Sequence, residues 1–163
     1  MNAITILKRC RAAKNDIERL QQRIEQRRDV LGSLSAPQAD PNGGSHGTGD
    51  KDKIGRILAD IDELEREMEA RKEAEKAEKV ASCALMDMVP DLEGRVLYDY
   101  YVKRMDTPEI ARKEKYTAGY IRKTKRNAEQ LLDMLGQERV RSVLPPWYLR
   151  EKGGESHEEK ADG

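Results

Sequence analysis

The sequence predicts an all-α protein, with an N-terminal antiparallel coiled-coil hairpin and a C-terminal trihelical domain of the helix-turn-helix kind. Charged residues make up 38% of the 163 residues, aromatic residues make up only 4%, and phenylalanine is missing. Such a chain cannot fill a broad globular core. Its apolar residues recur instead at helical spacing in stretches rich in Ala, Glu, Lys, Leu and Arg, which favours long helices that bury a narrow stripe.

The hairpin is predicted at residues 1–89, and its first helix runs from about Ile4 to Leu31. Apolar side chains recur there at alternating steps of four and three residues, with one polar interruption. This is the heptad spacing of a coiled-coil seam, which can also support a homodimer. The predicted seam consists of Ile6, Cys10, Ala13, Ile17, Leu20, Ile24, Arg27 and Leu31.

A connector and a second long helix complete the hairpin. Residues 32–50 are rich in Gly, Ser, Pro and Asn, so we predict a flexible connector. The second helix starts near Asp50, becomes a solvated, charge-paired helix over residues 69–79, and ends or kinks at Pro90. Its predicted seam consists of Ile54, Ile57, Leu58, Ile61, Leu64 and Met68.

Residues 90–136 are expected to form the trihelical domain. A first helix, at about 91–103, supplies an apolar support for the next two. Asp106 is placed to cap the second helix and Thr117 to cap the third, which starts at Ala118. The support is expected to consist of Leu92, Val96, Leu97, Tyr100 and Tyr101.

The helix from Ala118 is expected to have an inner and an outer face, because successive residues step by about 100° around its axis. Four basic residues and no acidic residue lie between Thr117 and Arg126, although the whole chain has 31 basic and 31 acidic residues. Concentrated positive charge suits a DNA-reading helix, and the alternative is an ordinary solvated basic face. The expected inner residues are Ile121, Thr124, Ala128, Leu131, Leu132 and Leu135.

The candidate DNA-binding residues lie on or next to this helix. We expect Arg122 and Lys123 to read base edges, whereas Lys125 and Arg126 mainly hold phosphates. Tyr120 is the aromatic residue placed to stack on bases. The full candidate set consists of Thr117, Gly119, Tyr120, Arg122, Lys123, Lys125 and Arg126.

Three short motifs carry a family resemblance. They are Leu97-Tyr98-x-x-Tyr101-Val102, Pro108-Glu109-Ile110-Ala111 and Tyr116-Thr117-x-x-Tyr120-Ile121. Together they resemble region 4 of bacterial sigma factors, in the version of phage regulators of the ArpU/RinA type, over residues 92–135. The resemblance implies a phage or prophage transcriptional regulator of late genes, which binds double-stranded promoter DNA and acts with host RNA polymerase.

Two residues depart from the family pattern. Glu114 stands where the pattern has an apolar residue, and Lys115 stands where helix-turn-helix motifs often have glycine. A non-glycine residue at positive φ costs roughly 1 kcal/mol, so we expect a looser turn.

Two other functions fit the same pattern. A DNA-packaging adaptor of the small-terminase kind also joins a helix-turn-helix to oligomerising helices, and a polymerase-binding protein can carry this fold without touching DNA.

We expect no enzyme, because the carboxylates have no His, Ser or Cys partner at a plausible spacing. We also expect no cofactor and no metal, since His46 and His157 lie far apart in polar segments.

The cysteines and the C-terminus complete the predictions. A hairpin whose helices pair evenly across the connector would place Cys10 opposite Glu73, with Cys83 roughly 15 Å further along the axis. This is too far for a disulfide, so two reduced, buried thiols are expected.

Residues 137–163 are predicted to be a largely disordered tail, whose apolar motif at 143–149 either folds back or docks a partner. Since no apolar run approaches the roughly 20 residues of a membrane span, we expect a cytoplasmic protein. The family resemblance implies that this cytoplasm is that of the bacterial host cell.

Overall fold

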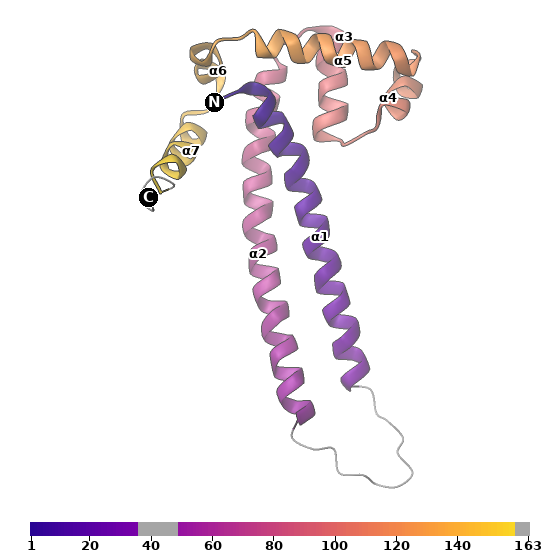
Figure 1. Ribbon diagram of the computed structural model, residues 1–163, viewed down its shortest axis with the longest axis vertical. Coiled ribbons are helices and arrows are strands. Elements are labelled where there is room, and N and C mark those ends of the chain that lie inside the picture. The colour runs from indigo at the N-terminus through magenta and orange to yellow at the C-terminus, as the bar shows by residue number, and fades with distance from the viewer. Residues whose placement is uncertain (36–48, 159–163) are drawn as a thin grey trace. The chain divides into compact units, whose positions relative to one another are not determined.

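A computed structural model describes residues 1–35 and 49–158, and all regular structure in these ranges is helical (Figure 1). The prediction of an all-α protein is therefore confirmed. The first long helix, α1 (Ala3–Ser35), and the second, α2 (Gly49–Met86), each extend into the segment predicted to be the connector. The rest of that predicted connector, residues 36–48, lies outside the described residues.

The chain divides into two compact units. Lys14–Glu73 forms one unit, which we call the paired-helix unit. Met1–Ala13 and residues 74–158 belong to the other, which we call the multihelix unit. This division differs from the predicted boundary at residue 90, because it assigns the start of α1 and the end of α2 to the unit that also holds residues 90–136.

The paired-helix unit is an antiparallel pair formed by parts of α1 and α2. Ion pairs join Asp16 to Arg71 at 3.7 Å and Arg28 to Glu65 at 2.6 Å, so the two helices run in opposite directions. Exposed ion pairs contribute only about 0–1 kcal/mol each, and the buried apolar residues between the helices contribute more. Those buried residues are Leu20, Ile24, Ile57, Ile61 and Leu64.

One predicted seam residue of this unit is misplaced. Leu58 was expected beside Ile57, yet its side chain is 47% exposed whereas that of Ile57 is 8% exposed. Adjacent residues on a helix differ by about 100° in direction, so a narrow seam cannot bury both. Arg27, the predicted polar interruption, is exposed and lies 3.9 Å from Asp60.

The multihelix unit contains the first turns of α1, the last turns of α2 and six further helical elements. A helical turn of the π type, η1 (Tyr98–Val102), continues α3 (Asp91–Leu97), where a single helix was expected. Two helices, α4 (Thr107–Glu114) and α5 (Ala118–Asp133), follow. The chain then forms α6 (Gln137–Val143) and α7 (Pro146–Glu158).

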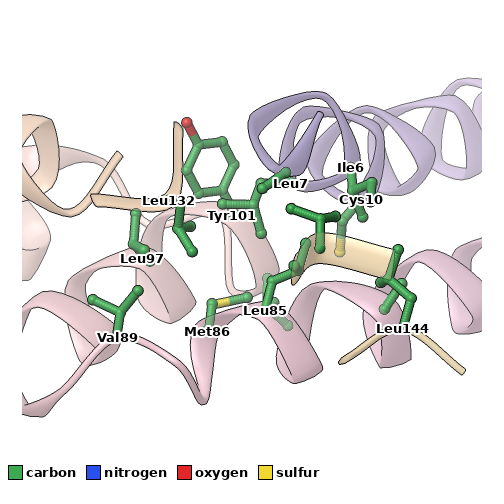
Figure 2. Packing of buried hydrophobic residues seen from close by; sticks show 14 of the residues in the cluster. Ile6, Leu7, Cys10, Leu85, Met86, Val89, Leu97, Tyr101, Leu132 and Leu144 are labelled. Atoms are coloured by element: carbon green, nitrogen blue, oxygen red, sulfur yellow. The ribbon is translucent and has the colours of Figure 1, made fainter. Parts of the chain in front are cut away.

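A single apolar cluster joins most of these elements (Figure 2). Ile6 and Leu7 of α1 pack with Leu85 of α2, and all three are fully buried. The predicted division between a hairpin of residues 1–89 and a domain of residues 90–136 does not match this core. The cluster also includes Cys10, Met86, Val89, Leu97, Tyr101, Ala128, Leu132, Val140, Leu144 and Tyr148.

The predicted disorder is wrong for residues 137–158, which form α6 and α7. Of the two alternatives for the apolar motif at 143–149, the structure shows that it folds back, because Leu144 and Tyr148 lie in the core cluster. Val140, Leu144 and Tyr148 are buried, and they recur every fourth residue across the two prolines. Pro146 occupies the first position of α7, where its missing N–H costs no intrahelical hydrogen bond. The remaining five residues of the predicted tail, 159–163, lie outside the described residues.

Tyr148 also changes the interpretation of the polar run in α2. Its hydroxyl donates a 2.6 Å hydrogen bond to the Glu78 carboxylate, and Lys152 lies 3.3 Å from the other Glu78 oxygen. Glu78 is only 4% exposed. The end of the run predicted to be solvated is therefore covered by α7.

The pairing of α1 with α2 is shifted from the predicted one. Cys10 lies beside Ser82, not Glu73, and Cys83 is close enough to influence its ionisation. Both thiols are free, but Cys10 is buried whereas Cys83 is only partly buried. Burial is the main cause that raises the pKa of each thiol above its ordinary value.

Candidate nucleic-acid interface

The start of α4 is fixed by a capping box. The Asp106 carboxylate accepts a 2.8 Å hydrogen bond from the Glu109 backbone N–H, and the Glu109 carboxylate accepts one of 2.9 Å from the Asp106 N–H. Both bonds satisfy backbone donors that the helix leaves unpaired. The predicted cap at Asp106 is therefore confirmed.

The turn between α4 and α5 is tight, and a lysine occupies its strained position. Lys115 has φ 61° and ψ 42°, in the left-handed region that favours glycine. The Tyr116 N–H donates to the Ala111 carbonyl at 3.0 Å, and the Thr117 hydroxyl accepts from the Tyr120 N–H at 3.2 Å. The predicted cap at Thr117 is confirmed, and the turn closes despite the missing glycine.

The second departure from the family pattern, Glu114, has a specific contact. Its carboxylate lies 3.3 Å from Arg95 of α3, and its side chain is only 13% exposed. An ion pair to α3 therefore occupies the end of α4, where an apolar contact was expected.

The inner face of α5 packs as predicted except at one residue. Ile121, Thr124, Ala128 and Leu132 are buried, and Ile121 shares a cluster with Val96, Ile110 and Ala111. Leu131 was predicted to face inward, but it is 49% exposed. It is one residue from Leu132 and thus about 100° away from it around the helix.

The outer face of α5 carries three exposed cations, Arg122, Lys123 and Arg126. None of the three has an ion-pair partner among the described residues. Gly119 lies on the same face, and a Cβ built there would meet nothing within 4 Å. A ligand could therefore approach the backbone closely at this point.

Lys125 does not join this outer face. Its side chain is 21% exposed, and its Nζ lies 2.7 Å from the Glu129 carboxylate and 4.2 Å from the centre of the Tyr100 ring. Glu129 also accepts a hydrogen bond from the Tyr101 hydroxyl. Lys125 therefore helps to hold α5 against η1. It was expected to hold phosphates, but it does not lie on the outer face of α5 with the other candidate cations.

A buried carboxylate anchors α4 in the same manner. Asp99 of η1 is 1% exposed, and its oxygens lie 2.6 Å from Lys113 of α4 and 3.7 Å from Lys103. Lys113 is thus held by an internal ion pair. Two cations that the sequence prediction did not include, Arg112 on α4 and Lys115 in the turn, are exposed.

Two tyrosines lie at the N-terminal end of the outer face. Tyr116 and Tyr120 stack with ring centroids 4.7 Å apart and an angle of 25° between their planes. They are 48% and 47% exposed, respectively. The exposure predicted for Tyr120 is confirmed. Tyr116, which lies in the turn before α5, was not among the predicted residues.

Comparisons of the chain with protein-family models, with curated proteins and with solved structures find no match. Among residues 1–35 and 49–158, no helix has the length and hydropathy needed to span a membrane.

Proposed function

We propose that the multihelix unit binds double-stranded DNA, with α4, the turn and α5 acting as a helix-turn-helix and α5 entering the major groove. The observation that carries this proposal is the outer face of α5. Three exposed cations lie there without internal partners, beside a glycine that leaves the backbone open. The neighbouring cations Lys113 and Lys125 are occupied by carboxylates, so the outer face is distinct from an ordinary charge-paired surface.

The cellular role that we infer is that of a phage or prophage transcriptional regulator, possessing a domain like region 4 of sigma factors. It rests on the three motifs at residues 97–102, 108–111 and 116–121. In this role the protein binds promoter DNA and acts with host RNA polymerase, and the paired helices form a coiled coil suited to assembly as a homodimer. A ring-shaped assembly in light scattering would instead favour a DNA-packaging adaptor.

The test is to select bound fragments from the source genome at near-physiological salt and then to compare variants on the best fragment. Arg122→Ala should weaken binding by about 1–3 kcal/mol and relax sequence preference, because it removes a base contact. Lys125→Ala is the matched control, since this lysine is partly buried and paired. The Lys125→Ala variant should show the same dependence of the logarithm of affinity on the logarithm of salt concentration as the wild type.

A different result would reject the assignment. If Arg122→Ala left affinity and preference intact, α5 would not be the recognition helix. If no fragment were selected above background, the proposed DNA binding would be rejected.

A further inference from the structure

The Tyr116–Tyr120 pair lies on the surface at the start of α5. Neither ring belongs to any of the three apolar clusters of the described residues, and each is about half exposed. The rings stack mainly on each other, with centroids 4.7 Å apart. Tyrosine side chains exposed in this way are enriched at binding surfaces, where the ring provides apolar area at a low entropic cost.

The charge around the pair indicates what approaches it. From Lys115 to Ala128 the chain holds no acidic residue and five basic ones, of which Lys125 is paired with Glu129. Lys115 and Lys123 are exposed. Gly119, directly before Tyr120, leaves open space where a side chain would otherwise stand. An anionic surface that comes close to the backbone fits these features better than an apolar protein surface.

A DNA duplex offers few apolar groups to such a pair. The flat faces of its bases are covered by their neighbours in the stack, and only the edges are open in the major groove. On those edges the C5-methyl group of thymine is the apolar group. In a helix-turn-helix, residues near the start of the second helix contact the base edges, and Tyr120 is the third residue of α5.

We propose that Tyr116 and Tyr120 form one specificity element, which contacts thymine C5-methyl groups and makes the affinity depend on them. This inference rests on the proposed DNA binding by α5. It assigns a role to Tyr116, which was not among the residues predicted from the sequence. For Tyr120 it replaces stacking on an extruded base with contact to the edge of a base in the major groove.

The experiment uses the full-length protein and its selected duplex. Each thymine of the duplex is replaced in turn by deoxyuridine, which removes the C5-methyl group and keeps the hydrogen-bonding groups. The expected result is a loss of about fourfold in affinity at one or two positions, the equivalent of one buried methyl group at roughly 0.8 kcal/mol. At the remaining positions the affinity should stay the same.

Two double variants identify the residues responsible. Tyr116→Ala with Tyr120→Ala should abolish the difference between thymine and deoxyuridine, whereas Tyr116→Phe with Tyr120→Phe should retain it because the rings remain. Both variants should keep the wild-type circular dichroism, since the rings lie outside the core.

The outcomes separate this inference from the proposed function. If the protein bound its selected duplex but no deoxyuridine substitution changed the affinity, the inference would be overturned and DNA binding would stand. The same conclusion would follow if the double alanine variant still distinguished thymine from deoxyuridine. If the double alanine variant lost affinity by the same factor for thymine and deoxyuridine duplexes, the methyl dependence would remain, so the pair would contact the DNA at other groups. Failure to select any duplex would reject DNA binding itself, and the inference with it.

Discussion

A chain that starts at Val89 tests whether residues 90–136 form a domain of their own. The apolar cluster of the multihelix unit includes four large side chains that such a chain lacks, Ile6, Leu7, Leu85 and Met86. Burial of one such side chain contributes about 1.5–3 kcal/mol. The missing contribution is therefore roughly 6–12 kcal/mol, which is comparable to the whole stability of a typical domain. We expect this fragment to lack a cooperative thermal transition.

The matched control retains the cluster and removes the paired-helix unit. In it, residues 14–73 are replaced by a short Gly/Ser linker, so that Met1–Ala13 stays joined to residue 74. Thermal circular dichroism should show a cooperative transition for this control and a gradual, non-cooperative change for the Val89 fragment. The sequence predicted that residues 90–136 form a domain separate from the hairpin, which implies that the Val89 fragment would fold alone. A cooperative transition of that fragment, with helicity close to the control, would refute the shared core.

Two further predictions concern single residues. Lys115→Gly should raise the free energy of unfolding in urea by about 1 kcal/mol, because it relieves a left-handed backbone at φ 61°, and Lys115→Ala should give no such gain. Burial, and then the hydrogen bond to Glu78, raise the pKa of Tyr148 above its ordinary value of 10.0. The unfolded chain therefore loses the Tyr148 proton first, so the contribution of Tyr148 to stability should be constant below pH 10 and fall above it. The raised pKa values of Cys10, Cys83 and Tyr101 add alkaline losses of their own, which the wild type and the Tyr148 variant share. Urea titrations at pH 8 and pH 10.5 should show that the free energy of unfolding falls less for Tyr148→Phe than for the wild type. An equal fall in both proteins would contradict the burial of this hydroxyl.

Local signals in the sequence were sufficient to predict the helix starts. A capping side chain and the backbone N–H that it accepts from lie within three residues of each other, so Asp106 and Thr117 could be identified from the sequence. The exposed face of α5 followed from the helical period in the same way. Arg122 and Arg126 each lie about 100° or more around the helix from the buried Ile121 and Ala128, and their exposure was predicted.

The shared core depends on contacts that sequence spacing does not reveal. The apolar residues at the start of α1 continue the same heptad spacing as Leu20 and Ile24, yet Ile6 packs in a different cluster. The polar composition of residues 137–163 predicted a largely disordered tail, although Leu144 and Tyr148, on either side of the adjacent prolines at 145 and 146, are both buried. Periodicity predicts which side of a helix is buried, but it does not say which helix covers that side.

Lys125 shows how the same principle applies to the candidate interface. A count of basic residues from Thr117 to Arg126 gives four cations, but their directions around α5 differ. Lys125 is three residues before Ala128 and four after Ile121, so it lies on the flank of the buried face, where η1 supplies the Tyr100 ring as a neighbour. Arg11 of α1 lies over that same ring at 4.0 Å. The ring therefore receives one cation from α1 and one from α5. Lys125 lies within the segment that the sequence predicted to bind DNA, but its contacts hold α5 in place.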